Sequence, residues 1–174
     1  FIGTDVTGML DRHNDSAGID IRDSFSNRIE RNTIAFNQSA ASDTGVAVFS
    51  GTNNSIRANS MFKNVGLGID LLDDGVTIND AGDVDGLANN LLNFPVLESA
   101  TVAGGNLTIT GFARPDVEID FFIVDADPTG FGEGKTFLTT RQEGSADDTD
   151  ATTGTYGPGN VNGLNQGTDT TNRF

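Results

Sequence analysis

Apolar residues alternate with other residues in three short segments of the first half of the chain. Residues 18–21, 45–48 and 68–71 each consist of a glycine followed by an apolar, a variable and a second apolar residue. Such alternation predicts short β-strands with one buried face, and the glycine permits a sharp turn before each strand. The segments are separated by 27 residues and then by 23 residues, which is the pattern of an internal repeat.

An asparagine-punctuated segment repeats at the same spacing of 27 residues. Residues 27–37 are echoed by residues 54–64, with Ile or Met at matched apolar positions and Asn at both ends. We expect the apolar side chains to point inward and the asparagines to stack at turns, where Asn tolerates left-handed backbone and its amide bonds the next coil. The inward positions are Ile29, Ile34, Ile56 and Met61, and the stacked pairs are Asn32 with Asn59 and Asn37 with Asn64. The repeat therefore predicts a right-handed parallel β-helix with one coil per repeat.

The pattern of the second half is different. Short alternating segments are separated by turns that contain Gly or Pro, which predicts a small antiparallel β-sandwich. The expected strands are residues 96–102, 106–112, 117–124 and 136–140. We therefore predict an all-β chain with two domains. Residues 1–93 form parallel β-helix coils that end in an acidic, glycine-rich loop, and residues 94–174 form a β-sandwich that is incomplete at its C-terminal strand.

Several motifs together resemble one family of repeat proteins. Residues 1–8, the Asn-x-Ile-x-x-Asn coils, an Asp-rich loop at residues 74–85 and the segment at residues 93–97 follow one another along the chain. In this order they resemble the right-handed parallel β-helix repeat proteins of bacterial secreted and cell-surface chains, and the second half is similar to the β-sandwich module that often follows such coils. The resemblance implies a secreted or cell-surface location in a bacterium. It defines no activity, because the family is functionally mixed.

The charge of the chain argues against two classes of partner. The 174 residues include 25 acidic and 10 basic side chains, for a formal net charge of −15. This charge argues against a nucleic-acid partner and against attachment to an anionic membrane. The chain has no cysteine, and no stretch approaches the roughly 20 apolar residues of a membrane span. Since it begins at Phe1 without a signal peptide, we interpret it as a processed or excised piece of a longer secreted protein.

The outward strand positions supply the candidates for catalysis. The repeat aligns Asp20, Ala47 and Asp70 in one column. With coils about 4.8 Å apart, Asp20 and Asp70 would lie roughly 9–10 Å from each other, near the carboxylate separation of inverting glycosidases. Asp20, Arg22 and Asp70 are therefore the candidates for a polysaccharide lyase or hydrolase, and a plain solvated strand face is the alternative. His13, the single histidine, is expected to be a solvated loop residue.

The acidic loop supplies the candidates for a metal site. Carboxylate and amide oxygens on a glycine-punctuated loop are the ligands that Ca²⁺ prefers, and a cation would relieve their repulsion. The EF-hand pattern is not met, because Ala81 stands where that motif needs an oxygen ligand and no Glu closes the loop. The predicted ligands of a structural Ca²⁺ are Asp74, Asn79, Asp80, Asp83 and Asp85. A solvated acidic linker is the alternative.

Two classes of function stay open. The first is an extracellular or cell-surface structural or adhesive module, and the second is a polysaccharide-active enzyme or glycan-binding fragment that uses the outer β-helix face. No basic and acidic residues converge in the sequence, which favours the first class and a chain that is not an enzyme. A coil cut open at residue 1 and a missing strand after residues 170–174 predict strand exchange with neighbours. Those neighbours are other copies in a head-to-tail filament or further parts of a longer chain.

Overall fold

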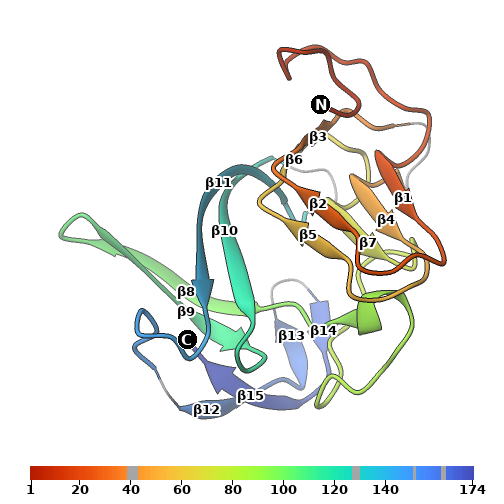
Figure 1. Ribbon diagram of the computed structural model, residues 1–174. Coiled ribbons are helices and arrows are strands. Elements are labelled where there is room, and N and C mark those ends of the chain that lie inside the picture. The colour runs from red at the N-terminus through yellow and green to blue at the C-terminus, as the bar shows by residue number, and fades with distance from the viewer. Residues whose placement is uncertain (39–42, 127–129, 151, 162–163) are drawn as a thin grey trace. The chain divides into compact units, whose positions relative to one another are not determined.

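The computed structural model describes residues 1–174 except residues 39–42, 127–129, 151 and 162–163. Apart from one short 3₁₀ turn, η1 (Ala88–Leu91), all regular elements in the described part are β-strands, which confirms the all-β prediction (Figure 1). The chain forms two compact units, and neither is continuous in sequence. Unit 1 comprises Phe1–Thr77, Gly86–Leu91 and Asp120–Thr139, and unit 2 comprises Ile78–Asp85, Leu92–Ile119 and Thr140–Phe174. The predicted division into domains after residue 93 stays a prediction.

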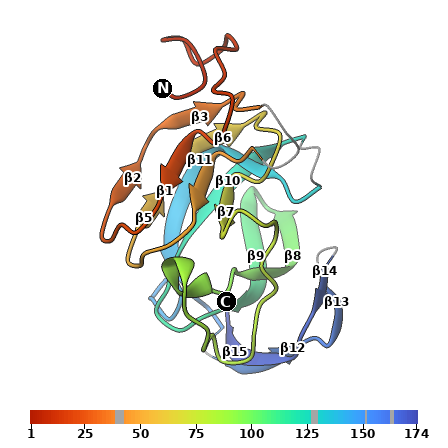
Figure 2. The ribbon, with the colours of Figure 1, turned by 90° about the vertical axis from the view of Figure 1, so that its right-hand side faces the viewer.

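Unit 1 contains a stack of short parallel strands, which we call the coil stack (residues 19–71). The strands form three parallel sheets in the orders β1-β4-β7, β2-β5 and β3-β6 (Figures 1 and 2). They are β1 (Ile19–Ile21), β2 (Arg28–Glu30), β3 (Thr33–Ala35), β4 (Val46–Val48), β5 (Ser55–Arg57), β6 (Ser60–Phe62) and β7 (Ile69–Leu71). Ile29 pairs with Ile56 and Ile34 with Met61, so the spacing of the sequence repeat is the register of the sheets. This register supports the predicted parallel β-helix.

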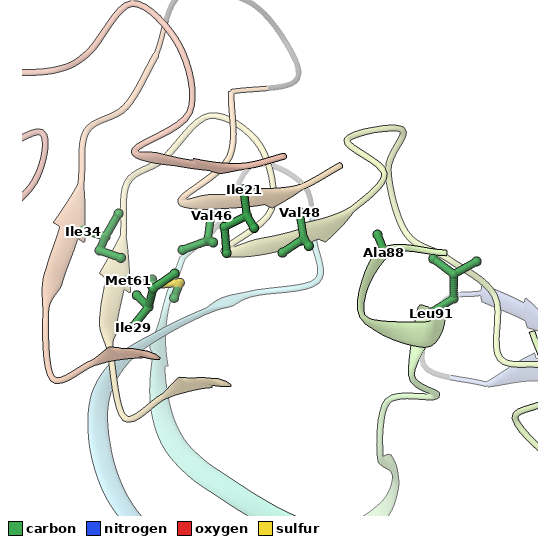
Figure 3. Close-up of a cluster of buried hydrophobic side chains, with 8 residues drawn as sticks. All are labelled: Ile21, Ile29, Ile34, Val46, Val48, Met61, Ala88 and Leu91. Carbon is green, nitrogen blue, oxygen red and sulfur yellow. The ribbon is translucent and has the colours of Figure 1, made fainter. Parts of the chain in front are cut away.

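Apolar side chains from the strands and from η1 form the core of unit 1. The buried cluster consists of Ile21, Ile29, Ile34, Val46, Val48, Met61, Ala88 and Leu91 (Figure 3). The predicted inward positions Ile29, Ile34 and Met61 are buried, and Ile56 packs against the same cluster. Burial of a side chain of this size stabilises the fold by about 1.5–3 kcal/mol. The alternation of apolar residues therefore decides which face of each short strand points inward.

Asparagine ladders run along the coil stack. In each ladder the backbone N–H and the side-chain amide of the upstream Asn both donate to Oδ1 of the Asn one coil downstream. The donor–acceptor distances are 3.1 and 2.7 Å from Asn27 to Asn54, 2.9 and 3.1 Å from Asn32 to Asn59, and 3.1 and 2.8 Å from Asn37 to Asn64. Both predicted stacks are confirmed, and the first of these pairs is a third ladder. In all three ladders these two donors face downstream, and Nδ2 of the downstream Asn also donates to a backbone carbonyl of the preceding coil.

The first residues of the chain add to one sheet of the coil stack. Ile2 pairs with Ile34, since Ile2 N–H donates to Thr33 O at 2.8 Å and Ala35 N–H donates to Ile2 O at 3.0 Å. Gly3 has φ of +73°, and a Cβ there would lie 2.0 Å from Ala35 O. Only glycine fits this position without a shift of the backbone. The segment therefore lies close against β3, on the side away from β6.

The main sheet of unit 2 is antiparallel and has the strand order β12-β15-β9-β8. Its strands are β8 (Val96–Ala103), β9 (Asn106–Ala113), β12 (Thr153–Tyr156) and β15 (Asp169–Arg173). Val96, Phe112 and Tyr156 form its buried apolar cluster, with Phe94 packed against it. Unit 2 also contains the ribbon of β13 (Gly159–Val161) with β14 (Leu164–Gln166). A further ribbon consists of β10 (Glu118–Asp125) with β11 (Glu133–Gln142), most of which belongs to unit 1.

The four strands predicted for the second half are present as β8 to β11. The alternation of apolar residues in these segments and the turn residues between them were sufficient to predict the strands. A sandwich requires two sheets packed face to face, and the described strand pairings do not establish such packing. The predicted sandwich therefore stays a prediction. The strand β15 lies inside the sheet, between β12 and β9, and Phe174 continues the pairing by exchanging backbone hydrogen bonds with Gly111.

Candidate functional site

The acidic loop of unit 2 brings three carboxylates together. Asp80, Asp83 and Asp85, which we call the loop carboxylates, each contribute one oxygen to a group whose members lie within 4.8 Å of one another. Left-handed backbone at Gly82 (φ 82°) and Asp83 (φ 55°) turns the chain between the first and the last of them. Three hard oxygen atoms therefore converge, as the coordination of Ca²⁺ requires.

Two buried asparagines tie this loop to the rest of unit 2. Asn79 donates to Phe94 O at 2.9 Å and to Tyr156 Oη at 3.0 Å, and its Oδ1 accepts from Phe94 N–H at 3.0 Å. Asn93 makes a similar exchange with Asp80, accepting from its N–H at 3.0 Å and donating to its carbonyl at 2.8 Å. Two reciprocal pairs of hydrogen bonds, between Asn79 and Phe94 and between Asn93 and Asp80, thus hold the loop in place. Such support keeps the loop carboxylates in place before any ligand binds.

The loop carboxylates are not fully satisfied by the protein. Asp80 Oδ1 and Asp85 Oδ1 are buried and have no hydrogen-bond partner in the described structure. Burial raises the pKa of Asp85, and the charges of Asp80 and Asp83 raise it further. Asp83 is better compensated, because its Oδ1 accepts from Asn93 N–H at 2.7 Å and Arg114 lies 3.9 Å from its Oδ2. Buried oxygens without partners carry a desolvation cost, which a bound cation would relieve.

The structure separates the five predicted calcium ligands into different groups. Asp80, Asp83 and Asp85 converge, as described above. Asn79 has its side-chain amide bound to Phe94 and Tyr156, so that its side chain supports the loop. Asp74 belongs to unit 1, whereas the loop carboxylates belong to unit 2. Three carboxylates leave further Ca²⁺ positions to water or backbone oxygen, since this ion takes 6–8 ligands.

The second group of acids lies on the outward positions of the sheet β1-β4-β7, which we call the coil face. Asp20 pairs with Ala47 and Ala47 with Asp70, which confirms the predicted column. The side chain of Asp20 is 40% exposed and lies 3.3 Å from the guanidinium of Arg22. Arg22 in turn stacks on the ring of Phe49, with 3.3 Å from Cζ to the ring centroid. The upstream part of the coil face is therefore solvated and its charge is paired.

Asp70 is in a different environment. It is only 3% exposed, its Oδ2 accepts from Gly75 N–H at 3.1 Å, and its Oδ1 is buried without a partner in the described structure. Burial raises the pKa of Asp70 to about 6, and the neighbouring charges of Asp73 and Asp74 act in the same direction. A carboxyl group with this pKa holds or releases a proton close to neutral pH, which is the requirement for a general acid or base.

The burial of Asp70 corrects one expectation. A solvated strand face was the alternative for this column, and it describes Asp20 but is wrong for Asp70. The reason is that residues after β7 fold back, so that Gly75 bonds the Asp70 carboxylate. Ile69, expected to point inward, is 42% exposed. The last strand of the stack therefore departs from the alternation that holds in the earlier coils.

One acid that follows the coil face in the chain was not among the predicted site residues. Asp73 has a buried Oδ1 without a partner in the described structure, and burial, followed by the charges of Asp20 and Asp43, raises its pKa. Its signal was an Asp-Asp-Gly turn directly after a strand, where Asp73 takes left-handed backbone with φ of 59°. The described part of the chain contains no set of three coil-face carboxylates as compact as the loop carboxylates.

His13 is part of neither group. Its Nδ1 lies 2.9 Å from Asp11 and its Nε2 lies 3.5 Å from Asp15, and its side chain is 43% exposed. The expected solvated loop position is confirmed.

Comparison with known proteins identifies a fold for part of the chain. Residues 4–83 match the family model described as a right handed beta helix region. The match covers the whole coil stack and supports the predicted repeat family for this segment. No solved structure gives a significant match. Within the described residues, no helix is long and apolar enough to cross a membrane.

Proposed function

We propose that the chain is a rigid structural or adhesive module of an extracellular or cell-surface protein. The observation that supports it is the set of three asparagine ladders, which bond one coil to the next over the length of the stack. These side chains are used for stiffness and are not directed at a ligand. Similarity of residues 4–83 to the right-handed β-helix region agrees with this role.

We further propose that the module is secreted by a bacterium and works beside neighbouring domains or other copies of itself. The resemblance of the repeats to bacterial surface chains supports this location. A net charge of −15 argues against nucleic acid as a partner. Electron microscopy of the native material at neutral pH tests the self-assembly. End-to-end fibres are the expected result, and dispersed monomers at high concentration contradict assembly of the chain on its own.

A structural Ca²⁺ at the loop carboxylates belongs to the same proposal. Because an ion bound only to the native state stabilises it by mass action, the melting temperature should rise with millimolar Ca²⁺ and fall after chelation. The double variant Asp83→Asn/Asp85→Asn should lose the shift. Asp15→Asn is the matched control, since the Asp15 side chain is 86% exposed and lies outside the loop. An equal shift in both variants rules out this site.

The second candidate function is a polysaccharide lyase or hydrolase that uses the coil face. One observation favours it, namely the buried Asp70 with its pKa of about 6. In this alternative Asp70 is the proton donor, Asp20 is the partner carboxylate and Arg22 contacts an acidic sugar. Structural roles for all three residues account equally well for their positions.

One assay separates the two candidates. The chain is incubated with a panel of neutral and acidic polysaccharides, and both reducing ends and unsaturated products are measured. The structural proposal expects no turnover, together with the calcium-dependent melting described above. Turnover that disappears in Asp20→Ala or Asp70→Ala, but persists in Asp15→Asn, would overturn the structural proposal and establish the coil face as an active site.

A further inference from the structure

The direction of the asparagine ladders creates a specific requirement at the downstream end of the coil stack. Each upstream Asn donates through its N–H and its amide, and the next coil supplies the acceptor. In the last complete coil, β5 and β6 are edge strands of their sheets, so their donors meet no further coil. Buried donors without acceptors are costly, and exposed strand edges promote association. The ladder donors at this end therefore need acceptors from outside the coils.

Glu133 of β11 supplies the acceptors for one ladder. Its Oε2 accepts from Asn64 N–H at 3.0 Å, and its Oε1 accepts from Asn64 Nδ2 at 2.6 Å. The same two donors of Asn37, one coil upstream, are accepted by Asn64 Oδ1. Glu133 is only 3% exposed. A carboxylate thus occupies the place that the Asn of a further coil would take.

Asp120 of β10 has the corresponding role beside the second ladder. Its Oδ2 accepts from Ala58 N–H at 2.8 Å and from Arg57 Nε at 3.0 Å, and its Oδ1 accepts from the Arg57 guanidinium at 2.8 Å. One coil upstream, the equivalent N–H of Arg31 donates to the carbonyl of Arg57. The carboxylate therefore replaces a backbone acceptor of a further coil. Its charge is paired by a guanidinium with two donors, the geometry that Arg favours.

The third ladder ends on an amide. Asn54 N–H donates to Asn89 Oδ1 at 2.9 Å, and Asn89 Nδ2 donates to Asn54 O at 2.8 Å. Asn89 has left-handed backbone with φ of 47°, as Asn tolerates at such turns. All three terminal acceptors belong to unit 1, although they come from separate parts of the chain.

We infer that Asn89, Asp120 and Glu133 form an end cap that terminates the coil stack and closes this end to coil-on-coil association. The cap is selective because a carboxylate accepts hydrogen bonds and has no donor to oppose the ladder. The partner that fits the uncapped face is the acceptor side of another coil of the same repeat, in particular from a second copy of this chain. This inference concerns contacts within unit 1, and it requires that the proposed end-to-end fibres form through surfaces other than the downstream end of the coil stack.

The first test measures whether the carboxylates hold the ladder ends. Glu133→Gln has nearly the same shape, but its amide group places a donor against a donor of Asn64. Amide exchange followed by NMR should show the Asn64 N–H exchanging at least about tenfold faster, since this buried group loses its acceptor. The Asn32 N–H, inside a ladder, should change much less. Equal protection of Asn64 in variant and wild type overturns the inference.

The second test measures whether the cap prevents association. Asp120→Asn/Glu133→Gln is compared with the wild type by sedimentation velocity over a range of concentrations. The double variant should associate with rising concentration more strongly than the wild type. Asp125→Asn is the control, because Asp125 is on the same ribbon and pairs with Lys135 at 2.7 Å without a contact to the ladders. If the double variant sediments as the wild type does while its Asn64 N–H exchanges faster, the blocking role of the cap is wrong.

Discussion

The coil face and the acidic loop both contain buried carboxylate oxygens without partners, yet they bring their acids together in different ways. On the coil face the acids come from different coils, with Asp20 and Asp70 two strands apart in one column. In the loop three acids lie within six residues and converge within 4.8 Å. Parallel strands are about 4.8 Å apart, so alternate coils hold their carboxylates roughly 9–10 Å from each other.

This spacing decides which chemistry each region is able to perform. Two oxygens about 10 Å apart do not share one Ca²⁺, whose ligands lie 2.3–2.6 Å from the ion. Burial instead raises the pKa of Asp70 to about 6, so that this carboxyl group holds a proton below about pH 6. The loop carboxylates are close enough to share a cation. A repeat separates like charges, whereas an irregular loop is able to concentrate them.

The largest expected effect follows from removing the support of the loop. Asn79→Ala deletes three hydrogen bonds, to Phe94 N–H, Phe94 O and Tyr156 Oη. We expect unfolding in urea to show a loss of about 3 kcal/mol, because buried partners are left unsatisfied. The melting shift with Ca²⁺ should also shrink, since the loop carboxylates lose their fixed positions.

A matched control exists for this change. Asn165 in β14 is exposed, and Asn165→Ala should alter stability by less than about 0.5 kcal/mol. Equal losses in the two variants would show that Asn79 gives the loop no special support.

The next effect concerns the proton on Asp70. The folded-state pKa of about 6 lies above the unfolded value near 3.8, so the folded state binds the proton more tightly. The stability that Asp70 contributes should therefore be fully present below about pH 3.8 and be lost as the pH rises through about 6. Asp70→Asn should flatten this dependence. At pH 7 the Asp70→Asn substitution should increase the free energy of unfolding by about 1–2 kcal/mol. This net gain already includes the cost of burying an amide donor without a partner.

Urea unfolding at pH 4 and at pH 7 measures both quantities. A wild type that becomes more stable over this interval, with no difference in Asp70→Asn, would falsify the assignment of a proton-holding role to Asp70. Asp23→Asn is the control, because Asp23 is exposed and bonds Ser50 outside the coil-face column.

A smaller effect is expected for Asp85→Asn. Without divalent ions this variant should differ from the wild type by less than about 1 kcal/mol, because it removes both a charge and its repulsion by Asp80 and Asp83. With Ca²⁺ present it should lose the stabilisation that the wild type gains. Calorimetric titration with Ca²⁺ gives the direct comparison, and undiminished binding by the variant excludes Asp85 as a ligand.

The smallest effect is expected for Asp20→Asn. The carboxylate is half-exposed and pairs with Arg22 across 3.3 Å, and pairs of this kind contribute about 0–1 kcal/mol. The change in unfolding free energy should stay within about 0.5 kcal/mol at all pH values. A pH dependence as large as that predicted for Asp70 would remove the distinction between the two acids.

The sequence was sufficient to predict the coils, because register and burial in a repeat follow from one spacing. Asn32 and Asn59, or Ile34 and Met61, need only be 27 residues apart to become neighbours. The loop carboxylates were also predictable, since they are local in sequence and their ligand types are known. In both cases the residues that come together are close in sequence or are related by the repeat spacing.

The remaining features depend on contacts that no local pattern contains. The burial of Asp70 follows from the backbone of Gly75 folding back, and the alternation of β7 alone predicted the opposite. Glu133 bonds Asn64 across 69 residues of sequence, and no repeat relates the two. The support role of Asn79 depends on Tyr156, 77 residues later. Long-range partners of single polar residues leave no periodic signal, so Asp70 and Asn79 were assigned from their chemistry only and Glu133 was given no role.

The uniform direction of the ladders also bears on how such a chain changes length by gene duplication. A copied coil of 27 residues arrives with an Asn Oδ1 that accepts from the coil before it and Asn donors for the coil after it, as the resident coils have. It is therefore compatible with its neighbours wherever it is inserted between existing coils. Neither the first coil nor Asn89, Asp120 and Glu133 would have to mutate. Length can then vary in steps while both ends of the module keep their sequences.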